Sequence, residues 1–489
     1  MRSRTFWIVA GLTALGAVLR FATLGDQAYH HDEIVTASRV LRVGFGHAMD
    51  AVGFSESAPP LYYALAWLWT QVTGNGEWGL RFLSALAGVA TIPVAYFTGR
   101  ELRGARAGVI AAALVAVNPM LLWYSQEARA YALLGFFCAL SLLYCVRALN
   151  DGRRADFTWW GVFSALALGT HYFAVFPIVA EVVLLARRRG RAILSGLWIV
   201  AVAVVLLAPL VIHQMSYGHA EWIGKFSLGH RVAEVGITFM VGETGDIIGR
   251  TEGWQPALVP LALVGVAFVI LLARGSRSER RAAFVPLAVA GATVGIPLLL
   301  AIFFTGKDFV LARNLLPALV PLLIGVAVAL STERLRRVGT ATAAVLVVYF
   351  LAFSIHASTS PELQRPDWRA VADHLGEPDG PRAMVTWTLG EAPLRFYLST
   401  GAIQLKASEG YDWLVREVAF VSMGEAAPPP SRLLGPGFRE TASEDVGPLF
   451  IRRYRVAGPD LVPLRLRGLR HAQMNFRNNG VLLDGVGPG

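Results

Sequence analysis

A run of four polar residues, His30-His31-Asp32-Glu33, follows the first apolar segment and is the most chemically suggestive part of the sequence. Asp32 and Glu33 stand at the first turn of a helix-like stretch, 34–50, where carboxylates cap a helix and complement its dipole. Alternatively, they bind a metal ion together with His30 or His31. A third use is general-base catalysis, because a carboxylate in a partly dry cleft has a raised pKa. The residue types alone leave all three uses open.

A second polar cluster, WYSQEARAY at residues 123–131, lies in a tight turn between two apolar segments. Glu127 and Arg129 of this turn either form an ion pair that finishes the two helices or face the same cavity as Asp32. The turn also contains Tyr124. The first interpretation makes the cluster structural, and the second makes it part of an active site.

Further candidates stand at the ends of other apolar segments. An arginine at a membrane edge extends its charged head toward water, and a lone histidine on an apolar face is ordinarily a satisfied core residue. Charged groups at the membrane edge are nevertheless functional candidates, and these all map to one side of the predicted membrane domain. The set comprises Arg81, His171, Lys307, Asp308 and Arg313.

The elements that must position these residues are membrane helices. The chain has 489 residues, of which 55% are hydrophobic and only 16% are charged, against about 25% charged residues in an ordinary globular protein. This composition excludes a soluble multidomain enzyme and a disordered chain. The two cysteines, Cys138 and Cys145, share one apolar segment, which excludes a disulfide framework and a cysteine metal cluster. The net charge of +10 comes with loop arginines, and we expect no nucleic-acid partner.

A hydrocarbon core of about 30 Å needs about 20 mostly apolar helical residues to cross it. The stretch 59–73 is interpreted as re-entrant or interfacial, because counting it as a span would break the alternation of arginine-rich loops. Its Tyr62 and Tyr63 suit the headgroup level. The arginines then place the N-terminus on the cytoplasmic side. We predict about 11 spans, near 5–24, 76–99, 105–123, 129–148, 157–171, 173–187, 192–212, 254–273, 282–304, 309–330 and 338–357.

From about residue 358 the chain becomes polar and rich in Pro and Gly. We therefore predict two domains: a transmembrane domain, 1–357, with an outer loop at 25–58, and a small extracytoplasmic α/β domain with a flexible tail, 358–489. Neither a P-loop nor a dinucleotide fingerprint is present, so an ATP-driven pump is not expected. Helices are predicted at 367–375 and 391–399, and strands at 382–388, 417–423 and 448–456.

Several motifs occur in an order that resembles a known family. The Asp32-Glu33 loop comes first, then PPLYY (59–63), RFLSALAG (81–88) and YSQEARAY (124–131), and then the short helical pair around His171. This order resembles the family 39 glycosyltransferases, type C membrane enzymes that include protein O-mannosyltransferases and the aminoarabinose transferase of lipid A. Two downstream segments, ARNLLPALVPLL (312–323) and RPDWRAVADHL (365–375), are similar to actinobacterial members. The resemblance implies the type C fold and a sugar donor carried on polyprenyl phosphate.

The resemblance also implies roles for individual residues. Asp32 matches the first acid of the family's loop motif and would be the catalytic base, while Glu33 would position the acceptor or the base. Arg81 would face the donor phosphate. The remaining residues are expected to bind the donor's phosphate or lipid (Arg129, Lys307, Arg313, Tyr62 and Tyr63) or to shape the site (Glu127, Tyr124 and His171).

One position departs from the family's pattern. The member that acts on lipid A has a lysine before its paired prolines, whereas Ala58 precedes Pro59-Pro60 here. Its donor contacts and aminosugar specificity therefore do not transfer, and Lys307 or Arg313 is the candidate for the missing charge. The scheme requires no metal or other cofactor, although His30 and His31 keep a metal site open.

The function expected from this reasoning is transfer of a sugar, with mannose favoured, from polyprenyl phosphate to a protein, lipid or glycan acceptor. The reaction would take place on the outer face of the cell membrane, with inversion at the anomeric carbon. Two alternatives come from other classes: a multi-span transporter or flippase, and a non-catalytic scaffold of the cell envelope. A third, an oligosaccharide polymerase or ligase with a pyrophosphate-linked donor, stays within the enzymes.

Overall fold

The computed structural model describes residues 3–41, 44–217, 223, 226–243, 254–304, 308–398, 402–404, 412–424, 434, 437–458, 460–465 and 479–485. Contacts divide the chain into two compact units, and each unit is built from two separate stretches of sequence. We call residues 1–24 and 40–359 the helical unit, and residues 25–39 and 360–489 the sheet unit.

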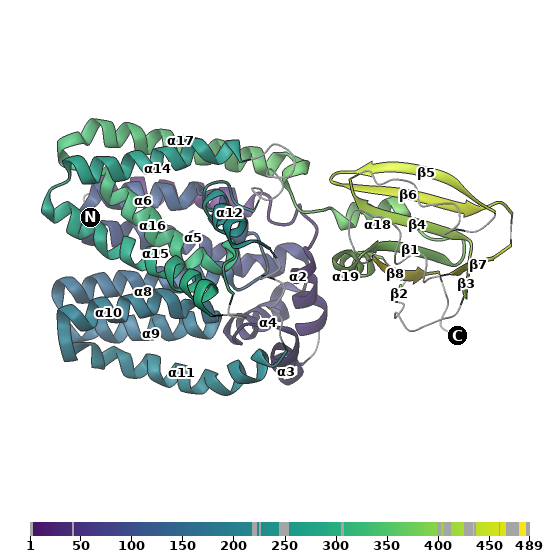
Figure 1. Ribbon diagram of the computed structural model, residues 1–489, viewed down its shortest axis with the longest axis horizontal. Coiled ribbons are helices and arrows are strands. Elements are labelled where there is room, and N and C mark those ends of the chain that lie inside the picture. The colour runs from purple at the N-terminus through teal and green to yellow at the C-terminus, as the bar shows by residue number, and fades with distance from the viewer. Residues whose placement is uncertain are drawn as a thin grey trace. The chain divides into compact units, whose positions relative to one another are not determined.

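The helical unit is a bundle of long apolar helices (Figure 1). Helix α16 lies among α5, α6, α14, α15 and α17, and all of its residues from Leu319 to Leu330 are buried except Leu322. The helices are α1 (Ser3–Phe21), α3 (Phe45–Ser55), α4 (Leu61–Thr73), α5 (Glu77–Arg103), α6 (Ala105–Val117), α7 (Pro119–Ser125), α8 (Tyr131–Asp151), α9 (Arg154–Thr170), α10 (Val175–Arg189), α11 (Leu194–Met215), α12 (Leu228–Val241), α14 (Gln255–Arg274), α15 (Arg277–Phe303), α16 (Leu319–Leu330) and α17 (Arg336–Thr359).

Within the described residues, eight helices are long and apolar enough to cross a membrane, or nine if the bent pair α6–α7 is one span. The sequence predicted about 11. The count differs because α9 has only 17 residues, and because Tyr172–Met215 counts as one stretch of 44 residues. At 1.5 Å per residue this stretch is about 66 Å long, enough for two crossings. The polytopic helical domain is confirmed.

Helix α4 has only 13 residues and is not among the candidate spans in the described part of the chain. Its length of about 20 Å is shorter than the hydrocarbon core. Tyr62 and Tyr63, which were expected at the headgroup level, are fully buried in the protein. Their environment is therefore protein rather than lipid headgroups.

The span predicted at 105–123 is broken by 57° between α6 and α7. Pro119 begins α7, because a proline lacks the N–H that would continue α6. The Asn118 side chain caps the new helix by accepting the N–H of Leu121 at 3.0 Å, and its amide donates to the carbonyl of Phe239 at 3.0 Å. This break determines where the turn after α7 begins, and that turn contains Glu127 and Arg129.

Helices α9 and α11 approach each other closely at two glycines. A Cβ added to Gly196 would lie 2.0 Å from the carbonyl oxygen of Phe157, and one added to Gly161 would lie 2.3 Å from the carbonyl oxygen of Gly196. Small residues of this kind let membrane helices pack backbone against backbone.

We expect Gly196→Ala to lower the free energy of unfolding by about 1–3 kcal/mol, because the added methyl group forces the two helices apart. Thermal unfolding of the purified protein in detergent measures this change. The matched control is Gly265→Ala in α14, where a Cβ meets no atom within 4 Å, and alanine favours the helix. Equal melting temperatures for the two variants would contradict the close packing of α9 and α11.

The sheet unit contains a six-stranded sheet with the order β2-β8-β1-β4-β6-β5 and a two-stranded sheet, β3-β7. Strands β1 and β4 are parallel and the other pairs are antiparallel. The helices and strands predicted in this region are found, and the mixed-sheet fold class is confirmed. The elements are α18 (Trp368–Leu375), β1 (Arg382–Trp387), α19 (Thr388–Tyr397), β2 (Ile403–Gln404), β3 (Asp412–Val415), β4 (Glu417–Met423), β5 (Phe438–Val446), β6 (Leu449–Val456), β7 (Val462–Arg465) and β8 (Asn479–Asp484).

Strand β1 is buried on both faces of the sheet. Its successive side chains point to opposite faces, so they enter two different clusters. Met384 packs in a cluster with residues of α18 and α19, whereas Ala383 and Val385 pack in a second cluster with β4 and β6. Arg382 is also fully buried, and its guanidinium binds the Asp484 carboxylate of β8 at 2.5 Å. The pairing ties the central strands together.

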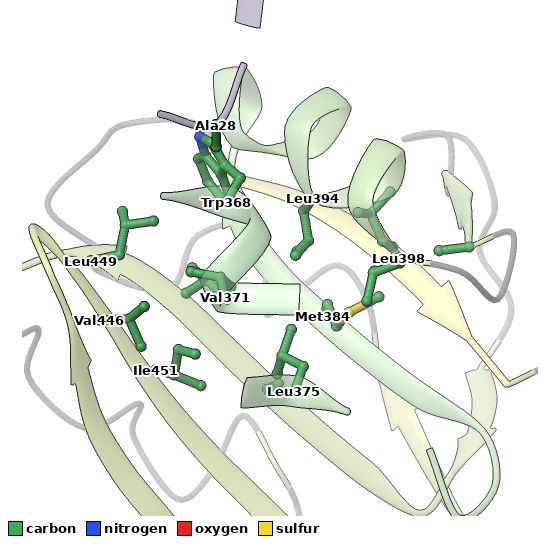
Figure 2. Close-up of a cluster of buried hydrophobic side chains, with 14 of the residues drawn as sticks. Ala28, Trp368, Val371, Leu375, Met384, Leu394, Leu398, Val446, Leu449 and Ile451 are labelled. Carbon is green, nitrogen blue, oxygen red and sulfur yellow. The ribbon is translucent and has the colours of Figure 1, made fainter. Parts of the chain in front are cut away.

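Residues 25–39 belong to the sheet unit although they come between α1 and α3 in the sequence. Ala28 has no exposed surface and lies in the cluster around Trp368 and Val371 of α18 (Figure 2). A one-turn helix, α2 (His31–Ile34), and a π-helix, Val35–Val40, follow. The loop that carries the predicted acidic motif is therefore part of the core of this unit.

Candidate functional site

The predicted site residues fall into both units. Asp32, Glu33, His30 and His31 belong to the sheet unit. The others belong to the helical unit, except that Lys307 lies outside the described residues.

Glu33 and His30 form the N-terminal cap of α2. The Glu33 carboxylate accepts the backbone N–H of His30 at 2.9 Å, and His30 Nδ1 accepts the N–H of Asp32 at 3.4 Å. Glu33 is fully buried, whereas the Asp32 side chain is half-buried. Of the two acids, Glu33 therefore has the capping role that the sequence left open, and Asp32 contributes its backbone N–H to the cap.

His31 Nδ1 donates a hydrogen bond to the carbonyl oxygen of Leu389 in α19 at 3.0 Å. Burial lowers the pKa of His31, while the Asp32 carboxylate opposes the shift, so the ring is neutral at pH 7. The Nδ1 atoms of both histidines thus take part in local hydrogen bonds. Among the residues that the structure describes, no group of three or more His, Cys, Asp or Glu side chains is placed to hold a metal ion.

In the helical unit, a buried ion pair joins Glu56 and Arg129. Glu56 follows α3 directly and is 3% exposed, and its Oε2 lies 2.9 Å from Nη1 of Arg129. The Tyr63 hydroxyl donates to the same oxygen at 2.7 Å. The other carboxylate oxygen, Oε1, is buried and has no hydrogen-bond partner among the residues that the structure describes. The predicted residues Arg129 and Tyr63 thus bind the same carboxylate, that of Glu56, which the sequence did not indicate.

Burial is the main cause that raises the pKa of Tyr63 well above its ordinary value. The Arg129 charge acts in the opposite direction, and Glu56 adds to the increase. The hydroxyl therefore stays protonated and donates to Glu56. The result is one positive group, one negative group and one neutral donor in a largely buried space, where electrostatic interactions are stronger than in water.

A chain of aromatic contacts connects the end of α7, the start of α8 and the segment between α9 and α10. The ring centroids of Tyr124 and Tyr131 are 4.9 Å apart, those of Tyr131 and His171 are 5.6 Å apart, and those of His171 and Phe173 are 4.8 Å apart. Tyr124 donates through its hydroxyl to the Glu243 carboxylate. The predicted site-shaping residues Tyr124 and His171 are therefore brought together in one cluster.

The predicted residues Glu127, Arg129 and Arg313 lie around the same cluster. The positive charges of Arg129 and Arg313 lie close enough to His171 to disfavour protonation of its ring. The Glu127 carboxylate lies close enough to the Tyr124 hydroxyl to interact with it electrostatically. Glu127 is buried, and its carbonyl accepts the backbone N–H of Arg129 at 2.8 Å. The structure thus joins the turn after α7 to the segment before α16.

Asp308 holds the segment that leads to Arg313. Its two carboxylate oxygens bind Nη1 and Nη2 of Arg231 in α12 at 2.6 and 2.5 Å, and Oδ1 also accepts the N–H of Val310 at 3.2 Å. Burial alone would raise the pKa of Asp308, but these hydrogen bonds and the Arg231 charge lower it. The carboxylate is therefore charged at neutral pH and forms a bidentate pair.

Arg81, the predicted phosphate anchor, lies in the first turns of α5 and is only 1% exposed. Its Nη1 donates to the carbonyl oxygen of Leu24 at 3.2 Å. The guanidinium is thus inside the protein and does not extend along the surface toward water, as an arginine at a membrane edge ordinarily does.

Residues 57–213 match the sequence model of the family described as dolichyl-phosphate-mannose-protein mannosyltransferase. Protein O-mannosyl-transferase 1 of Mus musculus is 32% identical over 108 residues, which is 20% of this chain and 14% of the mouse protein. The protein of the same name from Homo sapiens is 32% identical over 111 residues, 21% of this chain and 15% of the human protein. The predicted resemblance to protein O-mannosyltransferases is confirmed, over a small part of those proteins.

Solved structures extend the likeness over nearly the whole chain. ArnT from Cupriavidus metallidurans in the apo state has a TM-score of 0.56 at 16% identity, covering 92% of this chain and 98% of ArnT. The structure of the same protein bound to undecaprenyl phosphate has a TM-score of 0.55 at 15% identity, covering 93% and 100%. At these identities the likeness establishes the fold, a membrane helical domain followed by a sheet domain.

Proposed function

We propose that this chain is an integral membrane glycosyltransferase that moves a sugar from a polyprenyl-phosphate donor to an acceptor. The observation that carries the proposal is that the family match and most of the predicted site residues fall in the same part of the sequence. The segment that matches the mannosyltransferase family, 57–213, begins one residue after Glu56 and contains Arg129, the other member of the buried ion pair. It holds seven of the predicted site residues: Tyr62, Tyr63, Arg81, Tyr124, Glu127, Arg129 and His171. The likeness to a protein that binds undecaprenyl phosphate supports a donor of this class.

In the proposed reaction, an acceptor oxygen attacks the anomeric carbon. A carbon–oxygen bond forms there as the bond to the phosphate oxygen breaks, and attack from the opposite side inverts the centre. Asp32 takes the acceptor's proton, which is worth roughly 10²–10⁴-fold in rate. Arginines hold the departing polyprenyl phosphate, because a planar guanidinium bonds two phosphate oxygens at once. No metal takes part in this scheme.

The sugar that we favour is mannose, because the matching family is described by it. Protein, lipid and glycan hydroxyls are the candidate acceptors. We place the reaction on the extracytoplasmic side of the cell membrane, since the arginine-rich loops assign the N-terminus to the cytoplasm. The lipid tail of the donor would lie against the helical unit.

The test is a transfer assay on membranes that contain the chain, with radiolabelled mannose supplied on polyprenyl phosphate or on a nucleotide. We expect label in endogenous acceptors from the polyprenyl donor alone, and none in membranes that lack the chain. Separating the product into protein, lipid and glycan fractions identifies the acceptor. Transfer from the nucleotide donor alone would contradict the donor class. Movement of the intact donor across sealed vesicles, without transfer, would favour a transporter.

A further inference from the structure

The segment before Asp32 is packed into the sheet unit rather than exposed as a loop. Ala28 is fully buried against Trp368, and Figure 2 shows both in one cluster with Leu394 of α19. The next residue, Tyr29, is also fully buried, and its ring meets the ring of Phe396 edge-on, with centroids 5.8 Å apart. Apolar contacts thus attach this segment to α18 and α19.

Hydrogen bonds to α19 hold the segment on the N-terminal side of Asp32, one from a backbone N–H and one from a side chain. The N–H of Tyr29 donates to the Tyr397 hydroxyl oxygen at 2.7 Å, and His31 Nδ1 donates to the carbonyl oxygen of Leu389 at 3.0 Å. The first donor precedes Asp32 by three residues and the second by one. Both acceptors belong to the same helix.

Local structure alone does not explain why this segment has one conformation. Helix α2 has four residues, and so short a helix is unstable in water without tertiary contacts, because nucleation is costly. The π-helix that follows, Val35–Val40, is a rare form. The contacts with α18 and α19 therefore fix the backbone conformation at Asp32.

We propose that the sheet unit positions Asp32 for catalysis and that Tyr397 is a positioning residue of the transfer reaction. This inference rests on the proposed function, in which Asp32 is the base. Small displacements of a catalytic group from its productive geometry lower the rate strongly. Tyr397 acts through the backbone of Tyr29: when its hydroxyl is absent, the segment loses the hydrogen bond from the Tyr29 N–H to α19, and the Asp32 carboxylate samples positions away from the acceptor.

The test is steady-state kinetics of Tyr397→Phe in the full-length protein, with a polyprenyl-phosphate mannose donor. We expect kcat to fall about fivefold, the equivalent of one ordinary hydrogen bond, with the donor KM unchanged. The matched control is Tyr454→Phe. It removes a tyrosine hydroxyl that donates to Glu440 at 3.0 Å in the same unit, on a ring that packs with Phe420 in the other core cluster. Its kcat should equal that of the wild type.

A double-mutant cycle with Asp32→Asn separates positioning from stability. If Tyr397 acts through Asp32, Tyr397→Phe leaves the residual rate of Asp32→Asn unchanged, because no charged base remains to be positioned. If Asp32→Asn is inactive but Tyr397→Phe has the kcat of Tyr454→Phe, the positioning role is wrong while the proposed function stands. If Asp32→Asn has full activity, the assigned base is wrong, and the positioning proposal fails with it. A change in donor KM without a change in kcat would also overturn the proposal.

Discussion

Asp32→Asn should lower kcat for sugar transfer by roughly 10²–10⁴-fold, the range that general-base assistance contributes. Asparagine keeps the size of the side chain but cannot accept the acceptor's proton. The cap of α2 should be retained, because it uses the backbone N–H of Asp32 and the carboxylate of Glu33. The measurement is the single-turnover rate of mannose transfer to the identified acceptor, with equal amounts of each protein.

Asp26→Asn is the control for this variant. Asp26 is an exposed acid in the same segment, 25–39, so its replacement changes the charge as much without touching the cap of α2. Its rate should equal that of the wild type. An Asp32→Asn protein with the wild-type rate would show that another group takes the proton, and equal losses in both variants would point to a general effect of charge.

Glu56→Ala is expected to lower the free energy of unfolding by about 3 kcal/mol, near the low end of the range for breaking a buried ion pair. The low end applies because Arg129 keeps 15% of its side chain exposed, and water can partly solvate it. The variant leaves a guanidinium in the protein without the carboxylate at 2.9 Å and removes the acceptor of the Tyr63 hydroxyl. Chemical unfolding in detergent micelles measures the change.

Two further variants test whether loss of the Glu56–Arg129 ion pair causes the loss of stability in Glu56→Ala. Tyr63→Phe removes only one hydrogen bond to Glu56 and should cost about 1 kcal/mol. The double replacement Glu56→Ala with Arg129→Met should be more stable than Glu56→Ala alone, because no guanidinium then remains in the protein without the Glu56 carboxylate. If the double variant is less stable than Glu56→Ala by the full cost of a second substitution, the two side chains contribute independently and the pair does not hold the turn.

The helical domain was predictable because each span is a long apolar run, and the bilayer makes that signal strong. The break at Asn118-Pro119 was also within reach of the sequence, since a capping residue followed by proline is an ordinary helix start. It was missed because hydropathy continues unchanged across it. In the sheet unit, alternating apolar residues identified the strands, but not the order in which they pair.

The site was predictable only in part. Arg129, Tyr124 and His171 stand next to breaks in apolar runs, and these positions made them visible. Glu56 lies between two serines with no motif of its own, and its partner Arg129 is 73 residues away. Likewise, nothing in the composition of residues 25–39 indicates that Tyr29 bonds Tyr397, 368 positions later. Contacts over such distances depend on how the whole chain folds.

The position of β8 determines when, during synthesis, the six-stranded sheet can be completed. This strand, Asn479–Asp484, lies inside the six-stranded sheet between β2 and β1, so the sheet is incomplete until the ribosome has added those residues. At about 5–20 residues per second, Asp484 follows Asp32 by roughly 20–90 s. The segment that carries Asp32 therefore has no completed sheet unit to pack against while the described membrane helices are inserted. A nascent chain in the membrane would stay inactive until Asn479–Asp484 has been made.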